Sequence, residues 1–165
     1  MTFVSLWFTP LSVQDYKNEA VYIKMNEKTF DFWQNHSERY LEMAFRSDRR
    51  EAIEHPDGYG KRTGDCGDTV EIYLAVQEGC VQSVAYQTDG CMNTNACANT
   101  VAQLVEGKKI TTAWEITPEE VIDYLETLPP EQFHCAELAV GALYRALADY
   151  NALRQHPWKK LYRSG

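Results

Sequence analysis

The chain of 165 residues is 44% hydrophobic and 24% charged, which is typical of one globular domain that needs no disulfides for stability. Its formal net charge of −8 argues against a nucleic-acid partner, because affinity for phosphate backbones depends on Lys and Arg. No apolar run approaches the roughly 20 residues that cross a bilayer, so we expect a cytoplasmic protein without membrane contact.

The N-terminal part combines an uninformative start with one predicted helix. Residues 1–26 give mixed signals, and the opening MTFVSLWFTPL, which lacks the basic region and cleavage site of a signal peptide, is interpreted as an ordinary N-terminal segment. Over 29–53, apolar and aromatic positions then recur at helical spacing, at Trp33, His36, Tyr40, Met43 and Ala44. We therefore predict one amphipathic helix there, broken by the turn signal His55-Pro56-Asp57-Gly58.

A β-hairpin is predicted next. Residues 69–76 alternate between apolar and other side chains with a period of two, as a strand with one buried face does. Glu78 and Gly79 make the turn, and residues 81–88 return as a second strand rich in Val and Tyr. A short strand over 60–63 completes a small antiparallel sheet.

Everything after Asp89-Gly90 is predicted to be helical. One apolar stripe covers residues 97–105, and a second helix begins at Thr117-Pro118, where Glu120 completes a capping box. The last helix follows the i, i+3, i+4, i+7 pattern over 135–150. The predicted fold class is therefore α+β, a small three-stranded antiparallel sheet with helices packed on one face.

Five cysteines are present, an odd number without the closely spaced pairs of zinc fingers, so a disulfide framework and a compact zinc finger are both disfavoured. A cysteine taken singly is more often a packing residue than a ligand, and we keep that interpretation for Cys80 and Cys97. For Cys66, Cys91 and Cys135 both interpretations stay open. Each lies at the end of a predicted element, and these ends can converge at one edge of the domain.

The three element ends suit metal or sulfur chemistry. Cys91 and Cys135 begin helices, where unpaired N–H groups and the helix dipole favour a thiolate. A zinc site, or a soft iron or copper(I) site, takes three thiolates and one more donor, and Asp68 and His134 stand beside the thiols in sequence. The simpler alternative is that Asp65 and Asp68 only form a turn.

Four segments carry a family resemblance: PDGYGKRTGDCGDTVEIYL, TDGC, EGK and LPPEQFHCAELAVGALYRALADY. In order and separation they resemble NifU/IscU-type iron–sulfur cluster assembly scaffolds over about residues 28–152. The resemblance implies a SufE/NifU-like fold and a single domain of residues 1–165, with 1–27 and 153–165 as peripheral extensions. It further implies that Cys66, Cys91 and Cys135 hold a transient [2Fe–2S] cluster. By the same resemblance, Asp68 influences cluster release and His134 serves as an alternative ligand.

What the resemblance implies is a carrier rather than an enzyme. In that family a cysteine desulfurase delivers persulfide sulfur, iron enters, and the cluster passes to an apo-protein acceptor, while zinc binds the cluster-free form. The LPPVK segment associated with chaperone docking reads LPPEQ here, with Gln132 in place of Lys, which disfavours docking of the usual Hsp70-type chaperone. Whether two copies share one cluster as a homodimer is left open.

Three other functions fit part of the pattern. The main rival is a zinc-dependent sulfurtransferase of the SufU type, but the insertion that such proteins carry between the second and third cysteines is missing here. A zinc-bound interaction module is the second rival. A cysteine hydrolase is the third rival. We expect His134 and Cys135 to make a poor catalytic dyad, because the side chains of sequence neighbours should diverge on a helix.

Overall fold

The structure is a computed structural model that describes residues 31–158. The chain divides into two compact units, Met1–Asn35 and His36–Gly165. In the first unit residues 31–35 are helical, and the expectation for MTFVSLWFTPL falls outside the described residues. None of the helices between residues 31 and 158 combines the length and the apolarity needed to span a bilayer.

The second unit begins with a shorter helix than the sequence predicted. Helix α2 spans Glu38–Phe45, and Ser37, in an extended conformation, caps it by accepting a hydrogen bond from the Tyr40 N–H at 3.1 Å. After the helix, Arg46 is extended, and its carbonyl oxygen accepts a hydrogen bond from the Asn99 side chain at 3.1 Å. The prediction of one continuous helix over 29–53 is therefore wrong, because tertiary hydrogen bonds outweigh the local helical pattern.

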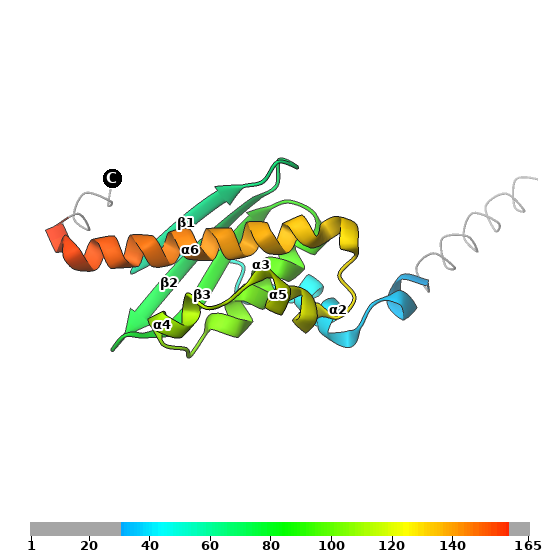
Figure 1. Ribbon diagram of the computed structural model, residues 1–165, viewed down its shortest axis with the longest axis horizontal. Coiled ribbons are helices and arrows are strands. Elements are labelled where there is room, and N and C mark those ends of the chain that lie inside the picture. The colour runs from blue at the N-terminus through cyan, green and yellow to red at the C-terminus, as the bar shows by residue number, and fades with distance from the viewer. Residues whose placement is uncertain (1–30, 159–165) are drawn as a thin grey trace, which may run out of the picture. The chain divides into compact units, whose positions relative to one another are not determined.

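Three strands form one antiparallel sheet in the order β1-β2-β3 (Figure 1). They are β1 (Gly58–Thr63), β2 (Thr69–Gln77) and β3 (Cys80–Asp89), which confirms the predicted hairpin and the short first strand. The register sets Thr63 opposite Thr69, and Thr69 opposite Asp89. The loop after β1 and the chain leaving β3 therefore meet at the same end of the sheet.

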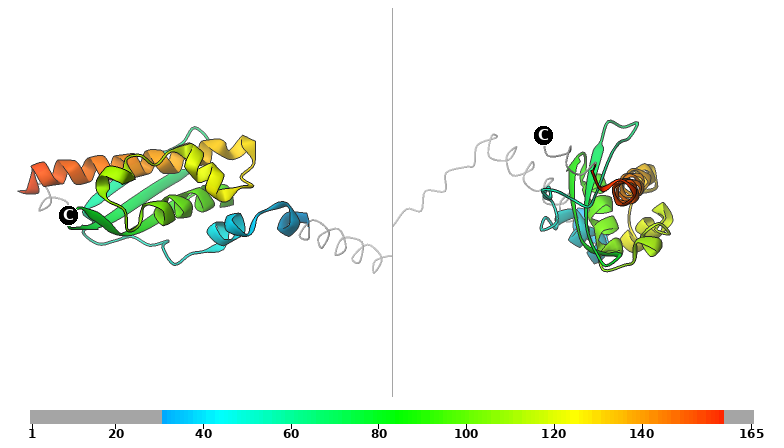
Figure 2. Two further views of the ribbon diagram at one scale, coloured as in Figure 1. Left: turned by 60° about the horizontal axis from the view of Figure 1, so that its bottom comes forward. Right: turned by 90° about the vertical axis from the view of Figure 1, so that its left-hand side faces the viewer.

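Helices cover one face of this sheet, on which Val70, Ile72 and Leu74 of β2 are completely buried. The α6 helix packs on β1 and β2, and α3 packs on β3, while α2 and α5 pack against α3 (Figures 1 and 2). The α+β prediction is confirmed, as is the capping box between Thr117 and Glu120. The bounds are α3 (Met92–Val105), α4 (Ile110–Ala113), α5 (Pro118–Leu125), the 3-10 turn η1 (Pro130–Gln132) and α6 (Phe133–Gln155).

Strand β1 and helix α6 approach each other so closely that only glycine fits at their contact. A Cβ atom added at Gly60 would overlap the backbone of Ala142 and Ala146 in α6. The same closeness brings the first turn of α6 toward the loop that follows β1. Packing of β1 against α6 therefore positions two of the segments that carry candidate ligands.

Two backbone segments cover the outer edge of β3. The Val81 N–H donates to the carbonyl oxygen of Lys108, and the Val81 carbonyl accepts from the Gly107 N–H, both at 2.8 Å. Further along the strand, the Tyr86 N–H donates to the carbonyl oxygen of Arg49 at 2.9 Å. Polar backbone groups at this edge are thus paired within the chain.

Candidate metal centre

The loop 64–68 between β1 and β2 carries two of the candidate ligands, Cys66 and Asp68. The loop closes on itself, because the Gly64 N–H donates to the Asp68 carbonyl at 2.8 Å and the Gly67 N–H donates to the Gly64 carbonyl at 3.0 Å. Gly67 has a φ of +88°, a conformation that glycine adopts without steric cost. The closed loop leaves the Cys66 side chain exposed and returns Asp68 to the end of the sheet.

Cys91 is the N-cap of α3 and is exposed. Its Sγ lies 3.5 Å from the Thr94 Oγ1 and accepts a hydrogen bond from the Asn93 side-chain amide at 3.7 Å. Partial burial opposes ionisation of this thiol, but hydrogen bonds from Thr94 and Asn93 outweigh the burial and lower the pKa of Cys91. This direction is the one expected for a thiol at a helix start.

The Asp68 carboxylate is anchored to the start of α3. Its Oδ2 accepts hydrogen bonds from the Thr94 hydroxyl at 2.5 Å and from the Cys91 N–H at 3.1 Å. The hydrogen bond from Thr94, the largest cause, lowers the pKa of Asp68, so the carboxylate is charged at neutral pH. Space for this contact depends on Gly90, where an added Cβ would lie 2.6 Å from the Asp68 Oδ2.

Cys135 is the third residue of α6 and is completely buried. Its Sγ lies 3.4 Å from the Thr94 Oγ1 and donates to the Gln132 side-chain oxygen at 3.5 Å. Burial raises the pKa of Cys135 to about 11. The expectation that a helix start favours its thiolate is therefore wrong for the metal-free protein, because the cost of burying a charge exceeds the benefit of the helix end.

The His134 imidazole lies beside Cys135. The His134 Nδ1 is 3.0 Å from the Glu131 carbonyl oxygen, which requires a proton on Nδ1, so Nε2 is the free acceptor. That Nε2 lies 3.6 Å from the Cys135 Sγ. The expectation that these neighbours diverge is thus wrong, because the ring folds back toward Glu131. A backbone carbonyl that fixes the other ring nitrogen is also the usual support of a metal-ligating histidine.

Three of the five sequence-predicted ligands form one tight group, in which the ligand atoms of Asp68, Cys91 and Cys135 all lie within 4.8 Å of one another. Cys66 and His134 are outside this group and line an adjoining depression of about 410 Å³. Ligand atoms around a tetrahedral zinc lie roughly 3.3–3.8 Å apart, so the group needs only a small contraction to hold a metal.

Sequence reasoning missed Thr94, a completely buried threonine of α3 that contacts Asp68, Cys91 and Cys135. Its position three residues after Cys91 puts it on the same side of the first helical turn, which is the one signal in the sequence. By contrast, Cys97 is completely buried and Cys80 is half-buried in β3, in agreement with their interpretation as packing residues.

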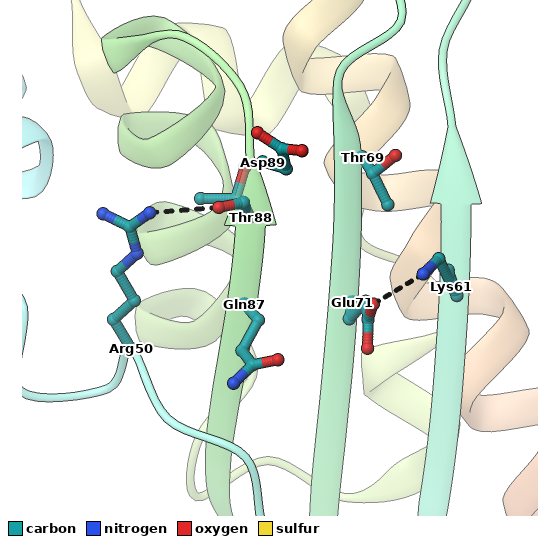
Figure 3. Close-up of a pocket in the computed structure, with 7 residues that line it drawn as sticks. All are labelled: Arg50, Lys61, Thr69, Glu71, Gln87, Thr88 and Asp89. Atoms are coloured by element: carbon teal, nitrogen blue, oxygen red, sulfur yellow. Dashed lines mark hydrogen bonds and ion pairs between the residues drawn. The ribbon is translucent and has the colours of Figure 1, made fainter.

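The sheet face turned away from α3 and α6 holds a different kind of depression, of about 470 Å³ (Figure 3). Three of its charged groups are engaged with one another or with backbone: the Lys61 Nζ lies 2.8 Å from the Glu71 Oε1, and Arg50 donates to the Thr88 carbonyl at 3.0 Å. No cysteine or histidine occurs among the described residues that line it. The chemistry suited to a transition metal is therefore at the end of the sheet, beside the loop 64–68.

Comparison with known proteins assigns the chain to a family. Residues 50–156, more than half of the chain, match the family described as NifU-like N terminal domain. The chain belongs to this family. The match includes all five candidate ligands on the loop 64–68, α3 and α6.

Relatives of this NifU-like chain include two scaffold proteins. It is 36% identical over 99 residues to the iron-sulfur cluster assembly scaffold protein IscU 1 of Archaeoglobus fulgidus, a stretch covering 59% of this chain and 65% of the relative. It is 34% identical over 91 residues to the iron-sulfur cluster assembly scaffold protein IscU of Escherichia coli, covering 54% and 70%. The chain thus spans about two thirds of the length of these relatives.

A solved structure shares the fold. The N-terminal part of a nitrogen-fixing NifU-like protein from Brucella abortus superposes with a TM-score of 0.57, covering 70% of this chain and 94% of that one at 19% sequence identity. At this identity the likeness concerns the NifU-like fold alone. It agrees with the helices and the three-stranded sheet described above.

Proposed function

We propose that the protein is a scaffold on which [2Fe–2S] clusters are assembled, with sulfur accepted from a cysteine desulfurase and the cluster passed on to apo-proteins. The convergence of Asp68, Cys91 and Cys135 from three separate segments, with Cys66 and His134 beside them, carries this proposal. The scaffold names of the two relatives support it. The family-like core of about 28–152, within one domain, is part of the same proposal.

The five residues divide the work by exposure. Cys66 and Cys91 are exposed and meet an incoming persulfide first. In that exchange a thiolate attacks the outer sulfur of the persulfide, a new S–S bond forms, the old one breaks, and the desulfurase cysteine leaves as a thiolate. The buried Cys135 and the neighbouring Asp68 and His134 then complete the ligand set for the cluster, which is cargo.

Anaerobic reconstitution of the purified protein tests this function. Ferrous iron and sulfide are added to metal-free protein, and the expected result is the visible absorption typical of a [2Fe–2S] centre. Zinc and iron contents are measured before and after the addition. Retention of one zinc without any cluster would overturn the proposal in favour of a zinc-dependent sulfurtransferase.

The Asp68→Ala variant is expected to hold its cluster longer than the wild type. A carboxylate is a hard, exchangeable ligand beside soft thiolates, so its loss removes the easiest route of departure. The change should be about tenfold, the scale on which one group supporting a metal site alters its properties. The measurement is the decay of visible absorption after an apo-protein acceptor is added.

The matched control for this prediction is Asp65→Ala, because Asp65 lies exposed on the same loop and its loss removes the same charge. The cluster of this control should decay at the wild-type rate. A shorter lifetime for Asp68→Ala, or equal changes in the two variants, would contradict the role of Asp68.

A further inference from the structure

A single buried hydroxyl joins the elements of the candidate metal centre. The Thr94 side chain is completely buried in the first turn of α3, and its Oγ1 contacts Asp68 on the loop 64–68, Cys91 at the helix start and Cys135 on α6. These three residues are also the tight group of metal-ligating atoms. Thr94 itself offers no good ligand for iron or zinc, so its role lies in its hydrogen bonds.

The hydroxyl has one proton to donate, and the distances decide where it goes. The contact with the Asp68 Oδ2 is 2.5 Å, whereas the sulfurs of Cys135 and Cys91 lie at 3.4 and 3.5 Å. A short hydrogen bond to a charged carboxylate is the strongest of the three. The Thr94 proton therefore goes mainly to Asp68, and its contacts with the two sulfurs are the weaker ones.

Without Thr94, Asp68 would lose its shortest hydrogen bond to α3 and keep the longer one from the Cys91 N–H at 3.1 Å. Both hydrogen bonds use the Asp68 Oδ2. They hold the carboxylate where one of its oxygens lies within 4.8 Å of the sulfurs of Cys91 and Cys135. We propose that Thr94 is the positioning residue that holds the Asp68 carboxylate against Cys91 and Cys135. Through Asp68 it sets how firmly this centre holds its metal, an inference that rests on the proposed function.

The chain contains a matched comparison for Thr94. Thr100 is also completely buried in α3, but its hydroxyl donates to the Ala96 carbonyl at 2.8 Å, within its own helix. Replacing either threonine with valine keeps the shape and removes one buried hydroxyl. Only Thr94→Val removes a contact with the ligand group, so any difference between the two variants reports on that contact.

The experiment measures the affinity of metal-free protein for Zn²⁺, by competition with a chromophoric chelator. Equilibrium affinity depends on the donors that are held in place, so Thr94→Val should weaken Zn²⁺ binding about tenfold. That is the lower end of the loss in metal affinity seen when a group that supports a ligand is removed. Thr94→Ser, which keeps the hydroxyl, should bind close to the wild-type value. Thr100→Val should also remain at the wild-type value.

The decisive measurement uses the double variant Asp68→Ala with Thr94→Val. Asp68→Ala alone should weaken Zn²⁺ binding, and adding Thr94→Val in that background should change the affinity little, because the group that Thr94 positions is already gone. An undiminished loss in the double variant, or equal losses for Thr94→Val and Thr100→Val, would overturn the proposal. Because the readout is Zn²⁺ alone, failure of cluster reconstitution would count against the proposed function and leave this result intact.

Discussion

Replacing Cys66, Cys91 or Cys135 with Ala is expected to abolish the visible absorption of the reconstituted [2Fe–2S] cluster. Each change removes one thiolate, and the other donors of metal-ligand type near the tight group are carboxylates and one imidazole: Asp68, with Asp65, His134 and Glu137 at the adjoining depression. With two thiolates left, the centre would depend on these harder donors, which we expect to bind a soft iron–sulfur cluster too weakly for it to form. The measurement is the visible spectrum after anaerobic addition of iron and sulfide.

The two remaining cysteines supply the controls. Cys80→Ala and Cys97→Ala should retain the cluster, because Cys80 lies in β3 and Cys97 is buried in the core. Cys97→Ala leaves a small cavity worth about 1 kcal/mol, so urea unfolding of each metal-free variant shows whether it is folded. Equal loss of the cluster in all five variants would contradict the assignment of the three ligands.

Gly60→Ala is expected to lower the free energy of unfolding by about 3 kcal/mol. This is the upper end of the usual cost of forcing an extra methyl group into a well-packed core. The added methyl group would collide with the backbone of Ala142 and Ala146, which cannot rotate away as a side chain can. Strand β1 would have to separate from α6, and the loop 64–68 would move with it. Urea unfolding followed by circular dichroism gives the free energy directly.

Gly64→Ala is the comparison for this stability prediction. A Cβ atom at Gly64 would lie 3.4 Å from the Cys66 Sγ and from a methyl group of Leu138, which is ordinary contact with movable side chains. Its free energy of unfolding should stay within about 1 kcal/mol of the wild type. A Gly60→Ala variant as stable as Gly64→Ala would show that β1 and α6 are not tightly packed.

The fold could be predicted from the sequence wherever local signals agree with tertiary structure. The alternation over 69–76 and the capping box at Thr117 are such signals, and both elements form as predicted. The helix over 29–53 could not be predicted correctly, because its interruption at Ser37 and its end before Arg46 depend on hydrogen bonds to residues 53 to 90 positions away. Such partners leave no trace in a local pattern.

The candidate site was also predictable only in part. The meeting of the loop 64–68 with the starts of α3 and α6 follows from elements that the sequence predicts. The raised pKa of Cys135 could not be predicted, since burial depends on how α6 packs. The contacts of Thr94 could not be predicted either, because threonine is not a typical metal ligand and nothing in the sequence marks one helical threonine as special.

The covered edge of β3 limits what can join this sheet. Exposed strand edges attract strands of other molecules, and such pairing leads to aggregation. At Val81 and Tyr86 the groups that a foreign strand needs already bind Lys108 and Arg49. At these positions the edge of the sheet along β3 is therefore closed to strands from other molecules.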